Sequence, residues 1–94
     1  MKYRFDYSEE KNLILKETRG VNFEDVIDAI EKGDLIDDLK HPSRRKFPNQ
    51  RILVVKIKGY IYLAPYVEDK KKGMVFLKTV YPSRKLSKSY LRKG

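Results

Sequence analysis

The sequence contains no cysteine and a single histidine, His41, and its longest apolar runs are only strand-sized. Without cysteine, the chain can form neither disulfides nor a thiolate metal site, and one imidazole is too few for a transition-metal centre. No run could span a membrane, and the charged N-terminus lacks the apolar segment of a signal peptide. We therefore expect a soluble, cytoplasmic protein without a metal or another cofactor.

Acidic residues almost disappear from the second half of the chain. Residues 1–40 contain 7 basic and 11 acidic side chains, whereas residues 41–94 contain 15 basic and 2 acidic ones. A lysine-rich proteome would explain many lysines, but it would not explain this asymmetry. The distribution predicts that the second half of the chain builds a surface for a polyanion.

Glycine-rich phosphate loops, dinucleotide fingerprints and nucleophile elbows are also missing, which excludes the common nucleotide-binding and hydrolase motifs. The chain has the length of one domain, and we expect a single domain over residues 1–94. A short strand at 3–6 is followed by two helices with N-caps at Ser8 and Asn22. The stretch 34–40 is an ambiguous edge strand.

Three further strands are predicted in RILVVKIKG, YIYLAPYVE and MVFLKTVY, and a last helix begins near Ser83. The short connections between these strands predict an antiparallel meander. The predicted fold class is therefore α+β, with two N-terminal helices and a C-terminal helix packed on one face of an antiparallel sheet.

The last helix is amphipathic in the sequence. At 100° per residue, Ser83, Leu86 and Tyr90 share a face that we expect to dock on the domain. The opposite face then carries a cationic stripe made of Arg84, Lys88 and Arg92, with Lys85 beside it.

Basic side chains contact phosphates, and tyrosine rings can stack on unpaired bases. This combination favours RNA or single strands over duplex DNA, because no helix-turn-helix or zinc finger is recognisable. An ordinary half-buried strand tyrosine is the alternative for each ring. The candidate RNA-binding residues are Lys56, Lys58, Arg44, Arg45, Lys85, Lys88, Arg92, Tyr60 and Tyr62.

RNA cleavage without a metal needs a base for the 2′-hydroxyl, cations on the phosphate and an acid for the leaving 5′-oxygen. Arg84 is the candidate phosphate clamp because its guanidinium binds two oxygens at once. Lys78 would add charge or act as a base, and His41 is a candidate acid or base because its ordinary pKa is near neutrality. An exposed loop histidine without a catalytic role is the alternative for His41.

The stretches FDYSEEKNL (5–13), RGVNFEDV (19–26) and SRKLSKSY (83–90) resemble the BrnT-type toxins of bacterial toxin–antitoxin pairs. The resemblance implies a RelE-like ribonuclease fold and an mRNA interferase that inhibits translation and growth. It implies Arg84 as a site residue, by its match to the arginine of the terminal helix motif. It also implies a cognate antitoxin, typically a ribbon-helix-helix protein, that covers the RNA face in a toxin–antitoxin hetero-oligomer.

Two positions depart from that family pattern. Arg19 stands where the family usually has histidine, and Lys88 and Ser89 stand where many members have glutamate. The FPNQ and PSRK segments also match a RelE-related subgroup. Two other readings therefore stay open: a non-catalytic RNA- or ribosome-binding module, and a protein-binding member whose basic face meets an acidic partner.

Overall fold

A computed structural model describes residues 4–91 of the chain. Its elements are β1 (Arg4–Asp6), α1 (Glu9–Thr18), α2 (Phe23–Glu31), β2 (Leu35–Lys40), β3 (Gln50–Ile57), β4 (Tyr60–Asp69), β5 (Met74–Leu77), β6 (Tyr81–Pro82) and α3 (Arg84–Leu91). The predicted α+β class is confirmed, and the ambiguous stretch before His41 is the strand β2. Two residues named in the sequence predictions, Tyr3 and Arg92, lie outside the described residues.

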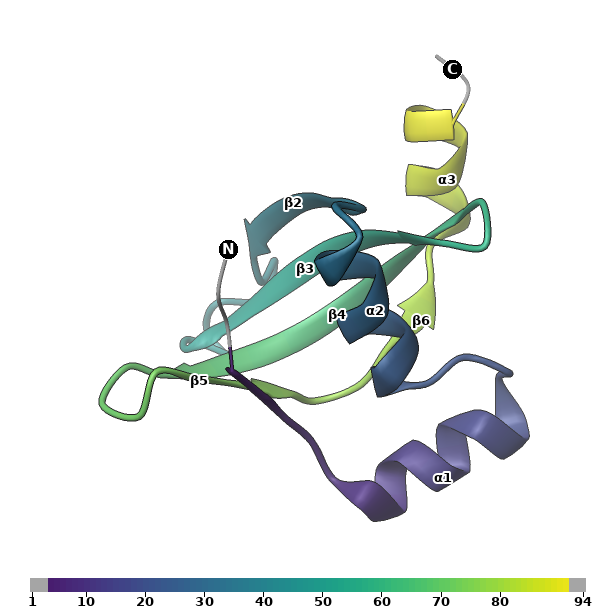
Figure 1. The fold of residues 1–94 in the computed structure, drawn as a ribbon. Helices are drawn as coiled ribbons and strands as arrows, with labels where there is room; N and C mark the ends of the chain where they lie inside the picture. Colours follow the sequence, from purple (N-terminus) through teal and green to yellow (C-terminus); the bar gives the residue numbers. More distant parts are fainter. Residues whose placement is uncertain (1–3, 92–94) are drawn as a thin grey trace.

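The strands form one mixed sheet in the order β1-β5-β4-β3-β2, with β6 paired to β4 (Figure 1). Strands β2 to β5 are antiparallel, as the short connections predict, but β1 is parallel to β5. The prediction of a purely antiparallel sheet was wrong in this respect, because no local sequence signal shows which strand pairs with β1 or in which direction. The predicted third strand is also divided, since β5 ends at Leu77 and β6 begins at Tyr81.

Both predicted helix caps are present. The Ser8 hydroxyl accepts a hydrogen bond from the Lys11 amide at 3.2 Å, and Asn22 forms a capping box with Asp25. Helix α1 ends where Gly20 adopts the left-handed conformation, with a φ of 67°. No helix in the described part of the chain is long and apolar enough to cross a membrane.

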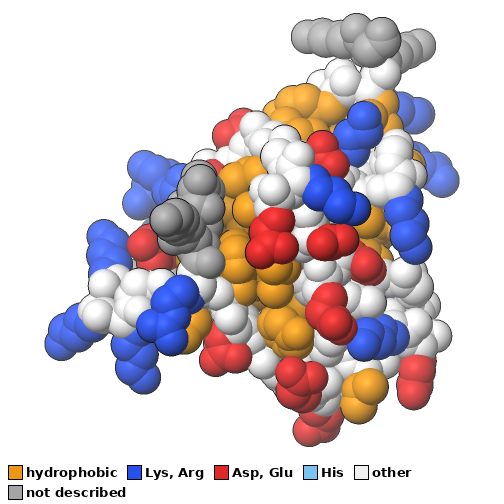
Figure 2. All heavy atoms as spheres, viewed as in Figure 1, with side chains coloured by type: hydrophobic (Ala, Val, Ile, Leu, Met, Phe, Trp, Pro, Cys, Tyr) orange, Lys and Arg blue, Asp and Glu red, His pale blue; other side chains and the backbone are white. Residues whose placement is uncertain are grey.

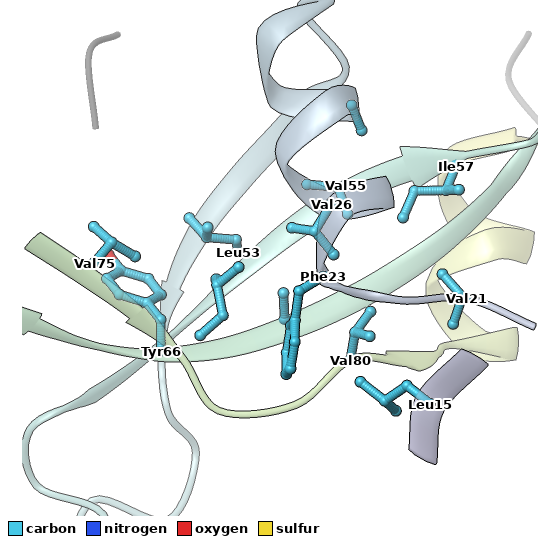
Figure 3. Close-up of a cluster of buried hydrophobic side chains, with 13 residues drawn as sticks. Leu15, Val21, Phe23, Val26, Leu53, Val55, Ile57, Tyr66, Val75 and Val80 are labelled. Carbon is cyan, nitrogen blue, oxygen red and sulfur yellow. The ribbon is translucent and has the colours of Figure 1, made fainter. Parts of the chain in front are cut away.

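Both N-terminal helices lie on one face of the sheet, and the main core is between them and the strands (Figures 1 and 3). Its buried residues are Leu15, Val21, Phe23, Val26, Ala29, Leu53, Val55, Ile57, Ala64, Tyr66, Val75, Leu77 and Val80. Since side chains alternate along a strand, the residues between these point to the other face, which α1 and α2 do not cover. We call it the helix-free face, meaning free of α1 and α2; its strand residues Ile52, Val54 and Ile61 are buried.

The joint between α1 and α2 is held by a buried amide side chain. Asn12 is 2% exposed, and its Oδ1 accepts a hydrogen bond of 2.8 Å from the Phe23 amide. Its Nδ2 donates to Glu24 at 3.2 Å. A polar residue within the apolar pattern of α1 therefore sets how the second helix begins.

Asp38 connects three neighbouring strands. The Tyr66 hydroxyl donates to both carboxylate oxygens of Asp38 at 2.9 Å, and the Arg51 Nε donates to Oδ1 at 3.1 Å. Burial of Tyr66, and then its hydrogen bond to Asp38, raise the pKa of the phenol well above its ordinary value. The same carboxylate raises the pKa of Arg51.

The backbone of Asp38 faces the outer edge of the sheet. The His41 amide donates to the Gln50 carbonyl on β3. Along an antiparallel strand the backbone amide and carbonyl of successive residues point alternately toward and away from the partner strand. The backbone amide and carbonyl of Asp38 therefore point away from β3. Its amide donates to the Asp37 side chain at 2.8 Å, and its carbonyl accepts from Arg51 Nη2 at 3.0 Å. Both backbone groups of this edge residue are therefore satisfied by nearby side chains.

Candidate functional site

Helix α3 is fastened to the edge of β4. The Ser83 amide donates to the Ile61 carbonyl at 2.9 Å, and the Ile61 amide donates to the Ser87 hydroxyl at 2.9 Å. The Ser83 hydroxyl accepts from the Leu86 amide and so caps the helix. This docking fixes Arg84, the first residue of α3, beside the start of β4.

The predicted docking face of α3 was wrong in one residue. Tyr90 is 38% exposed, whereas Ser87 is buried and Leu91 is half-buried. Ser87 turns inward because its hydroxyl pairs with a sheet amide, a role that a count of apolar residues does not reveal. Arg84 and Lys88 are exposed, as predicted.

Three of the candidate residues line one shallow hollow between α3 and the start of β4. Its volume is about 530 Å³, and its lining residues are Tyr60, Arg84, Ser87, Lys88 and Leu91. Arg84, Lys88 and Tyr60 therefore border the same open space. We call it the Arg84 hollow.

The other candidates near α3 differ in exposure. Lys85 is exposed on the first turn of α3, and Lys58 is exposed in the β3–β4 turn, where its φ is 52°. Tyr62 makes an edge-to-face contact with Tyr60, with ring centroids 5.9 Å apart, and packs against the margin of the main core. Tyr62 is therefore partly a structural residue.

Lys56 and Lys78 point to the helix-free face, opposite to Tyr60 and Tyr62. Lys56 pairs with Ile61, whereas Tyr62 pairs with Val55, a residue of the main core. The predicted RNA-binding residues are therefore divided between the two faces of the sheet.

Along one edge of the helix-free face, aromatic rings alternate with a cation. The Lys78 amide donates to the Pro65 carbonyl at 2.8 Å, and its ammonium lies 5.5 Å from the centroid of the Phe76 ring. On β6, Tyr81 pairs with Leu63 and is half-buried. Sequence reasoning missed Phe76 and Tyr81 as binding residues, although the two-residue spacing of Phe76 and Lys78 indicates a shared face.

His41 lies on the same face but at the other side of the sheet. It is bonded to Gln50, Gln50 pairs with Val67, and Val67 pairs with Phe76. Three strand spacings, about 14 Å, therefore separate the backbones of His41 and Phe76. His41 Nδ1 accepts a hydrogen bond from the Ser43 amide at 3.0 Å, so a neutral ring carries its proton on Nε2.

A second hollow, of about 810 Å³, lies where the 41–49 loop meets the β4–β5 turn. Its basic lining residues are Lys40, His41, Arg44, Arg51, Lys70 and Lys71. Arg45 is exposed in the same loop. The structure thus brings His41 and Arg44 together, and it leaves His41 and Lys78 outside the Arg84 hollow.

The charge asymmetry of the sequence is also an asymmetry in space. Figure 2 shows acidic side chains gathered over α1 and α2, with lysines and arginines toward the ends of the molecule. Within residues 4–91, no cluster of three or more histidine, aspartate or glutamate side chains is arranged to hold a metal ion.

Comparison with known proteins finds no relative of this chain. No protein-family model, no curated protein and no solved structure matches the chain. The chain is a small α+β domain with two N-terminal helices, a mixed and mostly antiparallel sheet, and a C-terminal helix.

Proposed function

We propose that this protein is the toxin of a type II toxin–antitoxin pair, and that it is a metal-independent endoribonuclease that cuts mRNA and so inhibits translation. The observation that supports the proposal is the Arg84 hollow, which Arg84, Lys88 and Tyr60 line together. The resemblance of residues 83–90 to the terminal helix of BrnT-type toxins supports the same residue, Arg84.

The chemistry of the hollow suits a phosphodiester. The Arg84 guanidinium binds two phosphate oxygens, and Lys88 adds charge as the negative charge on phosphorus grows. In this reaction the 2′-hydroxyl attacks the adjacent phosphorus and the bond to the 5′-oxygen breaks. We assign to the Tyr60 hydroxyl the role of giving a proton to the leaving 5′-oxygen.

The helix-free face supports a path for the RNA strand. Phe76 and Tyr81 offer rings for stacking, and Lys78 and Lys56 offer charge to phosphates. We propose that Lys78 guides the strand. The 2′-proton passes to solvent water, to which the hollow is open.

The second candidate function is a non-catalytic RNA- or ribosome-binding module. The separation of His41 and Lys78 from Arg84 favours it, because two of the three sequence-predicted catalytic residues do not share the hollow.

Induced expression in bacteria separates the two functions. The proposal predicts growth arrest with cut transcripts, which Arg84→Ala abolishes and Tyr60→Phe strongly reduces. Lys32→Ala is the matched control, since Lys32 is an exposed cation beside Asp28 on the helix side. Intact transcripts with retained RNA binding would establish the binding module instead, and absence of RNA binding by the folded protein would exclude both.

A further inference from the structure

Helix α1 presents aliphatic side chains to solvent. Leu13 is 59% exposed and Ile14 is 50% exposed, the highest values among large hydrophobic side chains of the described residues. With Glu10 and Glu17 they follow the spacing i, i+3, i+4, i+7, which places all four on one stripe. We call this stripe the outer face of α1.

The outer face of α1 is not needed for the helix to hold its place in the domain. The inward side buries Leu15 and Asn12, and the C-cap residue Arg19 donates through Nη1 to the Val80 carbonyl at 2.8 Å. Lys16 and Glu24 form a salt bridge of 2.9 Å between the helices. The fold therefore accounts for the inner side of α1 and leaves its outer aliphatic pair without a role.

A single exposed aliphatic residue is ordinary, but an adjacent pair on one helix stripe indicates a binding surface. The acids at both ends of the stripe specify the charge of what binds there. Nucleic acid is excluded, because its phosphates would meet Glu10 and Glu17. A second copy of the chain docked through the same stripe would bring these glutamates together.

We propose that the outer face of α1 docks a basic amphipathic helix of a partner protein. Aliphatic side chains of that helix pack on Leu13 and Ile14, and its lysines or arginines lie beside Glu10 and Glu17. Glu9, in the first turn of the same helix, adds a further acid to the field that such a partner would meet.

This surface lies on the helix-covered side of the sheet, away from Lys56 and Lys78. A partner bound there leaves Lys56 and Lys78 of the helix-free face uncovered. This differs from the arrangement that the toxin resemblance implies, in which the antitoxin covers the RNA face. The inference is independent of the proposed ribonuclease activity.

A designed helical peptide of about 18 residues, roughly five turns, is the probe. It carries leucines on one face and lysines beside them, and fluorescence anisotropy measures its binding to the full chain. Leu13→Ser/Ile14→Ser and Glu10→Lys/Glu17→Lys should each weaken binding by about tenfold or more, or about 1.4 kcal/mol. Ile36→Ser/Leu39→Ser is the matched control, because these aliphatic residues of β2 are also exposed, at 37% and 38%.

Unchanged binding by the stripe variants, or an equal loss in the β2 control, would overturn the proposal. A wild-type dimer that Leu13→Ser/Ile14→Ser dissociates would assign the stripe to self-association and also overturn it. Circular dichroism confirms that each variant is folded. RNA binding by the stripe variants should equal that of the wild type, which separates this test from that of the ribonuclease.

Discussion

The Ser87 hydroxyl accepts the amide hydrogen of Ile61 at 2.9 Å, so a side chain of α3 completes the hydrogen bonding of β4 at the point where Arg84 must be held. Ser87→Ala would leave this buried amide without an acceptor. The expected loss in the free energy of unfolding is about 1–3 kcal/mol. Urea denaturation measures it, with Ser89→Ala as the control, since Ser89 is exposed on the same helix. Equal losses in the two variants would contradict this role of Ser87.

Lys78 and Phe76 should contribute to RNA binding in different ways. Each phosphate contact to a single strand contributes about 0.7 to the slope of log Kobs against log salt concentration. Lys78→Ala should therefore lower that slope by about 0.7 and weaken binding for all sequences alike. Phe76→Ala should weaken binding by about 1–3 kcal/mol without changing the slope, because stacking releases no counterions. A slope unchanged by Lys78→Ala would remove Lys78 from the RNA surface.

Tyr66 should make the protein sensitive to alkaline pH. The pKa of the Tyr66 phenol in the folded protein is raised above its ordinary value of 10.0. The contribution of the protonated phenol to the stability of the folded state is therefore fully present below about pH 10 and is lost as pH rises toward the folded pKa. The free energy of unfolding should fall by up to about 1.4 kcal/mol per pH unit there. In Tyr66→Phe this component disappears, so the difference between the two proteins narrows above pH 10. A constant difference from pH 8 to 12 would show that Tyr66 does not titrate with folding.

Asn12 should be important for stability although it is polar. Asn12→Ala removes the acceptor of the buried Phe23 amide, and we expect a loss of about 1–3 kcal/mol in the free energy of unfolding. Thr18→Ala is the comparison, because the exposed Thr18 hydroxyl bonds only to the Ile14 carbonyl of its own helix. Thermal unfolding of both variants checks the difference, and a Thr18 effect as large as that of Asn12 would refute it.

The sequence predicted features that depend on neighbouring residues. Ser8, Asn22 and Gly20 mark helix ends by local chemistry, and the core-facing side of β3 follows from the pleat. The parallel pairing of β1 with β5 depends on residues about seventy positions apart, so no local pattern contains it.

The candidate site was predictable only in part, for the same reason. Arg84 and Lys88 are one helical turn apart, and the sequence placed them together. Tyr60 reaches them only because Ser87 docks α3 on β4, and the inward turn of a serine does not follow from its hydrophobicity. His41 and Lys78 share a face through three strand pairings, which a linear reading cannot measure.

The two side chains that satisfy the backbone of Asp38 have a consequence for how this protein behaves in a crowded solution. An edge strand with open amides and carbonyls is a template for the strand of another molecule, and such pairing begins aggregation. At the middle of β2, Asp37 and Arg51 already occupy the groups that an incoming strand would use. The short outer strand is thus closed to strand addition at its midpoint by the side chains of Asp37 and Arg51 rather than by a covering helix.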